Sequence, residues 1–313
     1  MPFCRQICKR VISTSANGIK RKSGKAYALL SMARPFPLLA ALLAWLLGVA
    51  IASGTGHVID PSAFAAGGIV MLLATLSLHF ANEFADFETD ARTVRTKYSG
   101  GSGVLPSGAL SRGVALQASA LALASAILIQ SGAVIMGLHS WLVLAIMLCG
   151  SFLGIMYSLP PLKLAWHGLG EVDNALLGGT FAPILAYVSL TGKLDLVVVL
   201  ACLPLVLLCF NNLLATSWPD RSADKFAGKL TLATRWSAKR LRLLYWLVFL
   251  VCTTVLIWLA MGIVPLAAAM LGFTALPIAF WGGLKYTKVE VVVGASFAME
   301  VWNVLQLIAW VAS

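Results

Sequence analysis

Residues 62–90 read SAFAAGGIVMLLATLSLHFANEFADFETD, and this stretch indicates both the fold class and the place of the chemistry. Its apolar part, residues 62–82, is long enough to cross the ~30 Å hydrocarbon core of a bilayer as an α-helix. The run ends in a polar cluster in which Asn82, Asp86 and Asp90 follow one another at steps of four, a spacing that keeps the three side chains on one face of a helix. The stretch therefore predicts a transmembrane helix with an acidic group at one membrane face.

Apolar runs of similar length recur along the whole chain and indicate an all-α membrane protein with nine transmembrane helices. Hydrophobic residues make up 60% of the 313 residues and charged residues only 11%, a composition that excludes a water-soluble fold of this size. The predicted spans are about residues 35–53, 62–82, 112–131, 139–158, 174–191, 195–216, 241–261, 263–282 and 290–312.

The basic residues between these runs are sorted to one side, which predicts the orientation. Of 23 lysines and arginines, Lys193 alone falls in a loop on the opposite side. By the positive-inside rule, the N-terminus and the acidic clusters are then cytoplasmic, and nine spans place Ser313 outside. Residues 1–34 are predicted to be a retained basic cytoplasmic tail, disordered or lying on anionic membrane lipid. The net charge of +11 thus reflects topology, and no nucleic-acid partner is expected.

A second acidic cluster ends the sixth run, in the stretch CFNNLLATSWPDRSADKFAGKLTLATR of residues 209–235. Asp220 and Asp224 are again four apart, which keeps both side chains on one helix face. Because Pro219 cannot continue the preceding helix undisturbed, we expect a break and a short new helix that carries both aspartates. The two clusters suggest two related halves, residues 35–170 and 171–313, facing each other across a central cavity.

Carboxylate and amide oxygens are the ligands that Mg²⁺ prefers, and proteins commonly hold this ion jointly with substrate phosphates. Two facing acidic clusters repel each other in a partly dry site, and divalent cations with a diphosphate would compensate that repulsion. Charged residues beyond a helix end also fit an ordinary solvated loop. Asn82 and Glu83, however, continue an apolar helix, where polar groups are costly and commonly functional.

Both stretches resemble the signature motifs of the UbiA superfamily of intramembrane prenyltransferases. The family's first motif, NxxxDxxxD, is matched by Asn82, Asp86 and Asp90. Its second, DxxxD followed by a Gly-Lys-x-Thr-Leu run, is matched by Asp220, Asp224 and residues 228–232. Further matches are YSLPPLKL at 157–164, GLGE at 168–171 and GGSGVLPSG at 100–108. The resemblance covers nearly everything after residue 30.

The resemblance implies nine helices around a central cavity, with a cytoplasmic cap that carries the two Asp-rich motifs. It also implies Mg²⁺-dependent transfer of an isoprenoid chain from a prenyl diphosphate to an aromatic acceptor. Mg²⁺ would make the diphosphate a better leaving group, and the acceptor ring would attack the allylic cation. The implied catalytic metal ligands are Asn82, Asp86 and Asp90 for one ion and Asp220 and Asp224 for the other. The diphosphate-binding candidates are Arg92, Lys97, Lys163 and Lys229.

Some polar positions allow two interpretations. Arg34 resembles a basic residue that faces the acceptor, and it equally fits a charge at the lipid headgroups. Tyr157 and Ser158 resemble cavity-lining positions, where the Tyr157 ring would stabilise positive charge, but an interfacial aromatic anchor also fits. Asn211 and Asn212 suit either the substrate site or a bond to a neighbouring helix.

Three polar residues deeper in the apolar runs favour structural roles. Glu300 and Asn303 lie three apart inside the last run, where an exposed carboxylate is expensive, so both are expected to face the bundle. There they would bond another helix or touch the cavity, and the bond to a helix is favoured. His79 precedes Asn82 by about one turn and fits either an acceptor-side polar group or a hydrogen-bonded packing histidine, of which the second is favoured.

The plain NxxxDxxxD motif and the GGSGVLPSG loop look closest to the branch that prenylates the quinone precursor 1,4-dihydroxy-2-naphthoate. Ala85 departs from the hydroxybenzoate branch, which tends to have arginine there. Hydroxybenzoate, homogentisate, chlorophyllide, haem and glycerol phosphate stay open as acceptors, as do chain length and oligomeric state. A cation or anion transporter is the alternative from another class, but both acidic clusters lie at one membrane face, whereas a permeation path needs polar residues throughout.

Overall fold

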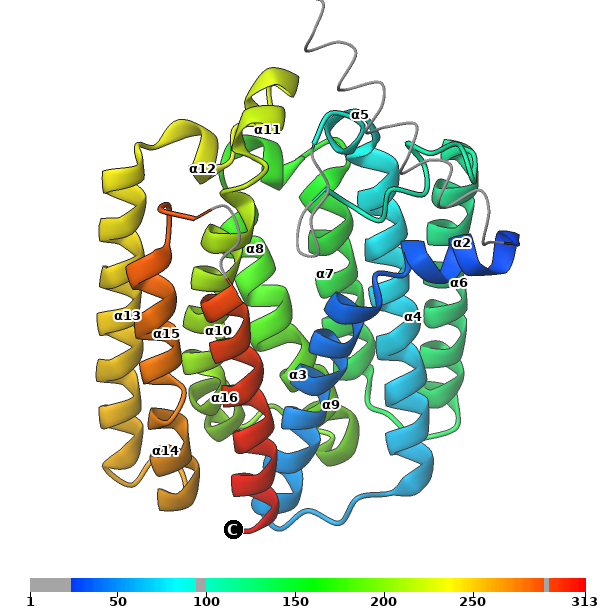
Figure 1. Ribbon diagram of the computed structural model, residues 1–313. Coiled ribbons are helices and arrows are strands. Elements are labelled where there is room, and N and C mark those ends of the chain that lie inside the picture. Colours follow the sequence, from blue (N-terminus) through cyan, green and yellow to red (C-terminus); the bar gives the residue numbers. More distant parts are fainter. Residues whose placement is uncertain (1–23, 94–99, 290–292) are drawn as a thin grey trace, which may run out of the picture.

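The computed structural model describes residues 24–93, 100–289 and 293–313, and over these ranges the secondary structure is helical, without a β-strand. The long helices run side by side in one bundle (Figure 1). Eight helical segments are long and apolar enough to cross a membrane. They are α3 (Pro35–Gly54), α4 (Pro61–Ala85), α6 (Arg112–Ile135), α7 (Trp141–Ser158), the continuous α8 (Gly170–Leu176), η2 (Leu177–Phe181) and α9 (Ala182–Thr191), α10 (Leu196–Ser217), α13 (Ala238–Ala260), and the pair α14 (Leu266–Phe273) and α15 (Leu276–Lys285). The all-helical prediction is confirmed.

The last helix, α16 (Val293–Val311), packs against α3, α10, α14 and α15 within the same bundle. It has 19 residues and carries the polar side chains of Glu300, Asn303 and Gln306, and it is not among the eight apolar segments. The ninth predicted span therefore stays a prediction.

Short elements occupy the end of the bundle opposite the C-terminus (Figure 1). These are α5 (Phe87–Asp90), the single 3₁₀ turn η1 (Leu164–His167), α11 (Arg221–Ala227) and α12 (Leu232–Arg235). The helix α2 (Lys25–Met32) lies across the bundle instead of along it. Its buried Ala28 and Met32 pack with Phe80 of α4 and Val104 of the following loop, so this short helix is held where it delivers Arg34 to α4.

Helix starts follow the local sequence. At the start of α4, Pro61 occupies the first turn, and the Asp60 carboxylate accepts a hydrogen bond of 2.8 Å from the backbone N–H of Ala63. This cap satisfies one of the unpaired N–H groups of the first turn, and proline has no N–H to satisfy there. At the end of α10, the chain leaves the helix after Ser217, just before Pro219.

Small residues set the closest helix crossings. A Cβ atom at Gly48 of α3 would overlap the backbone carbonyl of Pro183 at the start of α9, and it would approach the Ala186 Cβ to 2.9 Å. Helices in lipid gain little from the hydrophobic effect between them, so backbone approach of this kind is a main source of their association. The α3–α9 crossing therefore depends on glycine at residue 48.

We expect Gly48→Ala to destabilise the folded protein by roughly 1–3 kcal/mol, because the added methyl group forces α3 and α9 apart. Gly132→Ala in α6 is the matched control, since a Cβ there meets no atom within 4 Å. Thermal unfolding in detergent measures both variants. Equal unfolding midpoints for the two would contradict the tight crossing.

Candidate active site

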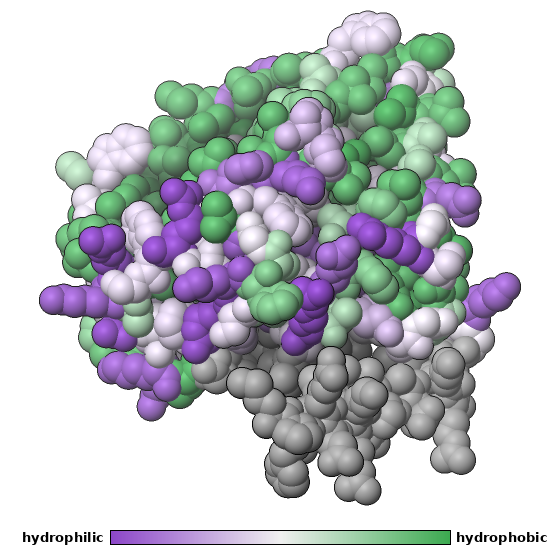
Figure 2. Space-filling model, turned by 90° about the horizontal axis from the view of Figure 1, so that it is seen from above, coloured by the Kyte–Doolittle hydropathy of each residue, from purple (hydrophilic) through white to green (hydrophobic). Residues whose placement is uncertain are grey.

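The two Asp-rich motifs lie at the same end of the bundle and face each other. Asp86 separates α4 from α5, Asp90 closes α5, and Asp224 lies in α11, which contacts α5. Viewed from this end, hydrophilic residues form a band across the middle of the face, and apolar residues are prominent above this band in the view (Figure 2). The fold thus brings together segments more than a hundred residues apart in the chain.

The local chain path explains how the aspartates are presented. The chain breaks around Pro219 as expected, but only Asp224 lies within the new helix, whereas Asp220 occupies the position just before it. Pro219 has no backbone N–H to continue the hydrogen bonds of α10, so the chain turns there and the new helix begins only at Arg221, which accounts for this correction. Similarly, α4 ends at Ala85 and α5 begins at Phe87, so Asp86 and Asp90 do not continue one regular helix face.

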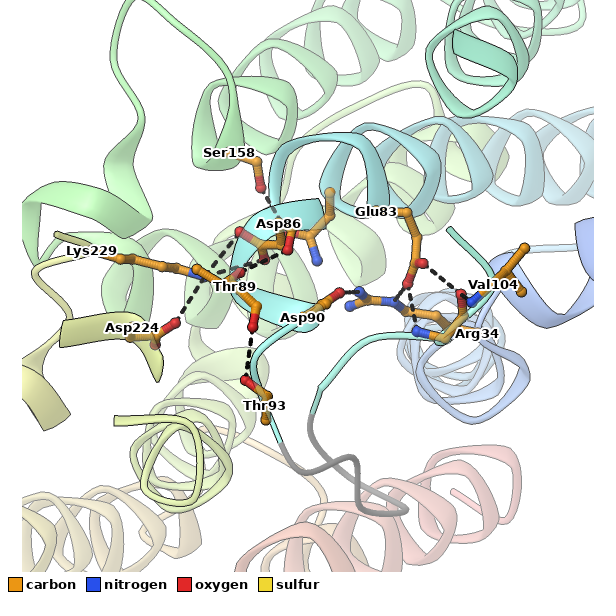
Figure 3. A network of polar contacts seen from close by, with 12 residues as sticks. Arg34, Glu83, Asp86, Thr89, Asp90, Thr93, Val104, Ser158, Asp224 and Lys229 are labelled. Atoms are coloured by element: carbon orange, nitrogen blue, oxygen red, sulfur yellow. Dashed lines mark hydrogen bonds and ion pairs between the residues drawn. The ribbon is translucent and has the colours of Figure 1, made fainter. Parts of the chain in front are cut away.

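One buried ammonium group joins the two motifs. The Nζ atom of Lys229 lies 3.1 Å from each carboxylate oxygen of Asp86 and 3.9 Å from Oδ1 of Asp224 (Figure 3). All three side chains are buried, with exposed fractions of 8% for Lys229, 7% for Asp86 and 5% for Asp224. The carboxylates of both motifs therefore converge on one point away from bulk water.

A second cation holds the rest of the first motif. Arg34 donates from Nε to Oε1 of Glu83 at 2.7 Å, and its Nη2 lies 3.9 Å from Oδ2 of Asp90 (Figure 3). The Asn82 amide is satisfied when its oxygen accepts from Nη1 of Arg34 at 2.8 Å and its nitrogen donates to Oδ2 of Asp86 at 3.0 Å. Asn82 thereby connects the polar contacts around Arg34, the Arg34 centre, to those around Lys229, the Lys229 centre.

Burial shifts the proton affinities of the acidic groups. Burial raises the pKa of Asp90 to about 8, although Arg34 opposes the shift, and it raises the pKa of Asp224 to about 7 against the effect of Lys229. Burial by itself lowers the pKa of Lys229, but the carboxylates of Asp86 and Asp224 outweigh this and hold it above its ordinary value. The site therefore favours bound positive charge.

The oxygen donors fit Mg²⁺ without forming a closed cage. Within the described ranges, no group of three or more His, Cys, Asp or Glu side chains lies close enough to enclose an ion. Mg²⁺ does not need such a cage, because it is usually held by one or two carboxylates and keeps positions for water and phosphate oxygens. Asp86 and Asp224 would supply that donor set, and Asn82 would join them only if its amide oxygen turned from Arg34 toward the ion.

Comparison with known proteins decides the family. Residues 28–304 match the model of the UbiA prenyltransferase family. The chain belongs to this family. It is therefore a prenyltransferase and an integral multi-pass membrane protein.

Individual UbiA-family relatives agree with this assignment. A curated 1,4-dihydroxy-2-naphthoate octaprenyltransferase from Bacillus subtilis (strain 168) is 28% identical over 218 residues, which cover 68% of this chain and 67% of the relative. The fold is similar to that of a UbiA homologue from Archaeoglobus fulgidus bound to DMAPP and Mg²⁺, with a TM-score of 0.67 and 16% sequence identity. The match covers 91% of this chain and 99% of the homologue. It is also similar to a structure of digeranylgeranylglyceryl phosphate synthase, with a TM-score of 0.66 and 16% sequence identity. This match covers 93% of this chain and 100% of the synthase structure.

The remaining basic candidates of this UbiA-family chain differ in their surroundings. Arg92 is exposed and stacks 4.5 Å above the ring of Phe226, so it links the ends of the two motifs. Lys163 has a positive φ of 45°, and its Nζ lies 4.8 Å from the centre of the Trp166 ring. Lys97 lies outside the described residues.

The uncharged candidates mostly connect helices. Asn211 donates a hydrogen bond of 3.3 Å to the backbone carbonyl of Tyr245 on α13, so it bonds a neighbouring helix, one of its two expected roles. Asn212 accepts from the Ser296 hydroxyl on α16 at 2.6 Å. His79 contacts the Ala33 carbonyl oxygen through Nδ1 at 2.7 Å, as expected of a packing histidine. Tyr157 is half-buried on α7 beside Ser158, whose Oγ lies 2.7 Å from the Asn82 amide.

Glu300 and Asn303 lie on α16, which follows both Asp-rich motifs in the sequence. Asn303 is buried and Glu300 is half-buried. Oε2 of Glu300 and Oδ1 of Asn303 are buried side-chain oxygens without a hydrogen-bond partner among the described residues.

Glu83 is an organising residue whose partners could not be named from the sequence. It is 1% exposed and accepts from Arg34, from the backbone N–H of Ser102 at 2.8 Å and from the Ser102 hydroxyl at 2.5 Å. The signal that could have identified it is a glutamate inside an otherwise apolar helix. Glu83 thus holds the glycine-rich loop against the first motif.

Glu171, at the end of the GLGE run, performs a similar task for the second motif. Its Oε1 accepts from the backbone N–H of Leu232 at 2.8 Å, at the first residue of α12. This contact fixes the segment that follows Lys229. Both loop segments that reach the site are therefore fastened by buried glutamates from the bundle.

Proposed function

We propose that this chain transfers an isoprenoid chain from a prenyl diphosphate to an aromatic acceptor, with Mg²⁺ as cofactor, and that the acceptor is 1,4-dihydroxy-2-naphthoate or a related quinone precursor. The observation that carries the proposal is the convergence of Asp86 and Asp224, from two distant motifs, on one buried point. The Bacillus subtilis relative supports the acceptor, and Archaeoglobus fulgidus homologues bound to DMAPP or GPP with Mg²⁺ support the donor and the metal.

The proposed roles follow from the positions of the side chains. The metal ligands would be Asn82, Asp86, Asp90, Asp220 and Asp224. When bound, Mg²⁺ neutralises the diphosphate and makes it a better leaving group. Lys229, which lies between the motifs, would bind phosphate oxygens, and the apolar bundle below would keep water away from the allylic cation. Arg92, Lys97, Lys163, Tyr157, Asn212 and Arg34 would complete the surroundings of the two substrates.

The proposed topology places the site on the cytoplasmic side, with α16 as the ninth span and Ser313 outside. The C-terminus lies at the end of the bundle opposite α5 and α11, which supports this assignment (Figure 1). The sorting of 23 basic residues, with Lys193 as the exception, supports the side. The chain forms one domain from residue 35 to 313, built from two related halves, behind a basic tail.

Purified protein with Mg²⁺ and farnesyl or geranylgeranyl diphosphate tests the proposal. The acceptor panel is 1,4-dihydroxy-2-naphthoate, hydroxybenzoate, homogentisate and glycerol phosphate. We expect pyrophosphate release and prenylated dihydroxynaphthoate, both abolished by EDTA. If glycerol phosphate were the only acceptor of the panel to be prenylated, the proposed aromatic acceptor would be wrong. If EDTA did not affect turnover, the proposed dependence on Mg²⁺ would be wrong.

A further inference from the structure

The backbone around Lys229 is fixed, and its side chain is directed into the site. Gly228 ends α11 with a φ of +80°, and the N–H of Lys229 donates to the Asp224 carbonyl at 2.9 Å. The next residue, Leu230, donates from its N–H to the carbonyl of Trp166 at 3.1 Å. Since the main chain is held on both sides of Lys229, rotation within the long side chain is the motion left for its ammonium group.

We propose that Lys229 is a resident counter-ion that competes with the divalent cation for Asp86 and transfers to the diphosphate when metal and diphosphate bind together. The inference rests on the proposed function and deepens it. It makes diphosphate, and not the metal alone, the ligand that opens the metal site.

The competition follows from the geometry at Asp86. Both of its carboxylate oxygens lie 3.1 Å from Nζ of Lys229, so the ammonium occupies the space in front of the carboxylate. A Mg²⁺ ion binds such oxygens at ~2.0–2.1 Å and would lie close to the ammonium. Two positive groups so close repel strongly in a partly dry site. The ion therefore displaces the ammonium from Asp86 or binds weakly.

Diphosphate resolves this competition because it supplies negative charge for the displaced ammonium. An ammonium group has three donors and no fixed orientation, so it can exchange a carboxylate for a phosphate oxygen without movement of the main chain. Arg34 is less free to do so, because its guanidinium donors have a fixed planar arrangement and are held by Glu83 at 2.7 Å and by the Asn82 amide oxygen at 2.8 Å. Of the described lysines and arginines, Lys229 is the one paired with carboxylates from both motifs.

The full-length protein in detergent provides the test, with the thermal unfolding midpoint and the apparent Mg²⁺ affinity as readouts. The probes are Mg²⁺ alone, inorganic pyrophosphate alone, and the two together. We expect Lys229→Gln to bind Mg²⁺ alone about tenfold more tightly than the natural protein, because the competing charge is gone. The same variant should unfold at a lower temperature without metal, because Asp86 and Asp224 then lack their cation, and pyrophosphate should no longer strengthen its Mg²⁺ binding.

Two further variants isolate the cause. Lys225→Gln removes one positive charge from α11, four residues away, but Lys225 is exposed and pairs with neither Asp86 nor Asp224 among the described contacts. It should leave Mg²⁺ affinity within about twofold of the natural value. Lys229→Arg keeps the charge and should keep Mg²⁺ binding weak without pyrophosphate.

The outcomes separate this inference from the proposed function. Equal affinity of Lys229→Gln and the natural protein for Mg²⁺ alone would overturn the exchange, even if prenyl transfer is observed. If Lys229→Gln does not fold, the natural protein decides, because failure of pyrophosphate to raise its Mg²⁺ affinity overturns the exchange. Cooperative binding of Mg²⁺ and pyrophosphate without prenyl transfer to any acceptor would support the exchange and reject the proposed function.

Discussion

Asp86→Asn should lower prenyl transfer by about 10²–10³-fold while the helical bundle stays folded. The amide has nearly the same shape as the carboxylate but no charge, so it weakens metal binding and removes the closest partner of Lys229. Because Asp86 also accepts from Asn82, the loss affects both centres of the site. Initial rates at saturating Mg²⁺ and prenyl diphosphate measure the effect.

The matched control is Glu88→Gln in the same short helix α5. Glu88 is exposed and two residues from Asp86, and its replacement removes the same charge without touching the buried centre. We expect activity within about twofold of the natural protein, because exposed charges contribute little at physiological salt. An equal loss in both variants would show that net charge at this face, and not the Asp86 site, controls turnover.

The membrane architecture could be predicted well because one physical length controls it. A helix must cross a nearly constant hydrocarbon thickness, so the apolar runs gave eight of the segments that the structure contains. Interruptions inside a run follow from packing and leave little trace in composition. The run at 263–282 is in fact the two helices α14 and α15, and the run at 174–191 contains the π-helical turn η2.

The candidate site was predicted in part. The four-residue spacing correctly placed Asn82 beside Asp86, since their side chains hydrogen-bond in the satisfied orientation. It did not predict that Asp90 faces Arg34 while Asp86 faces Lys229, because the helix break at Asp86 ends the regular spacing.

Pairings between distant residues were beyond the reach of the sequence. Arg34 and Glu83 lie 49 positions apart, and their contact depends on how α2 packs across α4. The contact of Glu83 with Ser102 depends on the path of the glycine-rich loop. Neither contact is encoded in a local spacing. From the sequence, Arg34 could therefore be interpreted only as a residue that faces the acceptor or the lipid headgroups. The structure adds a third role for Arg34, as the counter-ion of a buried glutamate.

Gly101→Ala should reduce prenyl transfer by about 10²-fold through displacement of Asp90. A Cβ atom at residue 101 would overlap the Asp90 carboxylate, and the φ of +61° at this residue is itself unfavourable for alanine. The loop cannot retreat easily, because the next residue, Ser102, is held by Glu83 through two hydrogen bonds. Asp90 must therefore move away from Arg34. Activity and the thermal unfolding midpoint are measured together.

Gly108→Ala separates the collision from the backbone strain. Gly108 lies in the same glycine-rich loop and has a similar φ of +73°, but a Cβ there meets no atom within 4 Å. Both variants therefore carry the cost of a left-handed alanine, about 1 kcal/mol, and only Gly101→Ala disturbs a carboxylate. We expect similar losses of stability but a large loss of activity in Gly101→Ala alone. If Gly108→Ala lost activity equally, loop strain would be the cause, and Asp90 would not need its position against Gly101 and Arg34 for turnover.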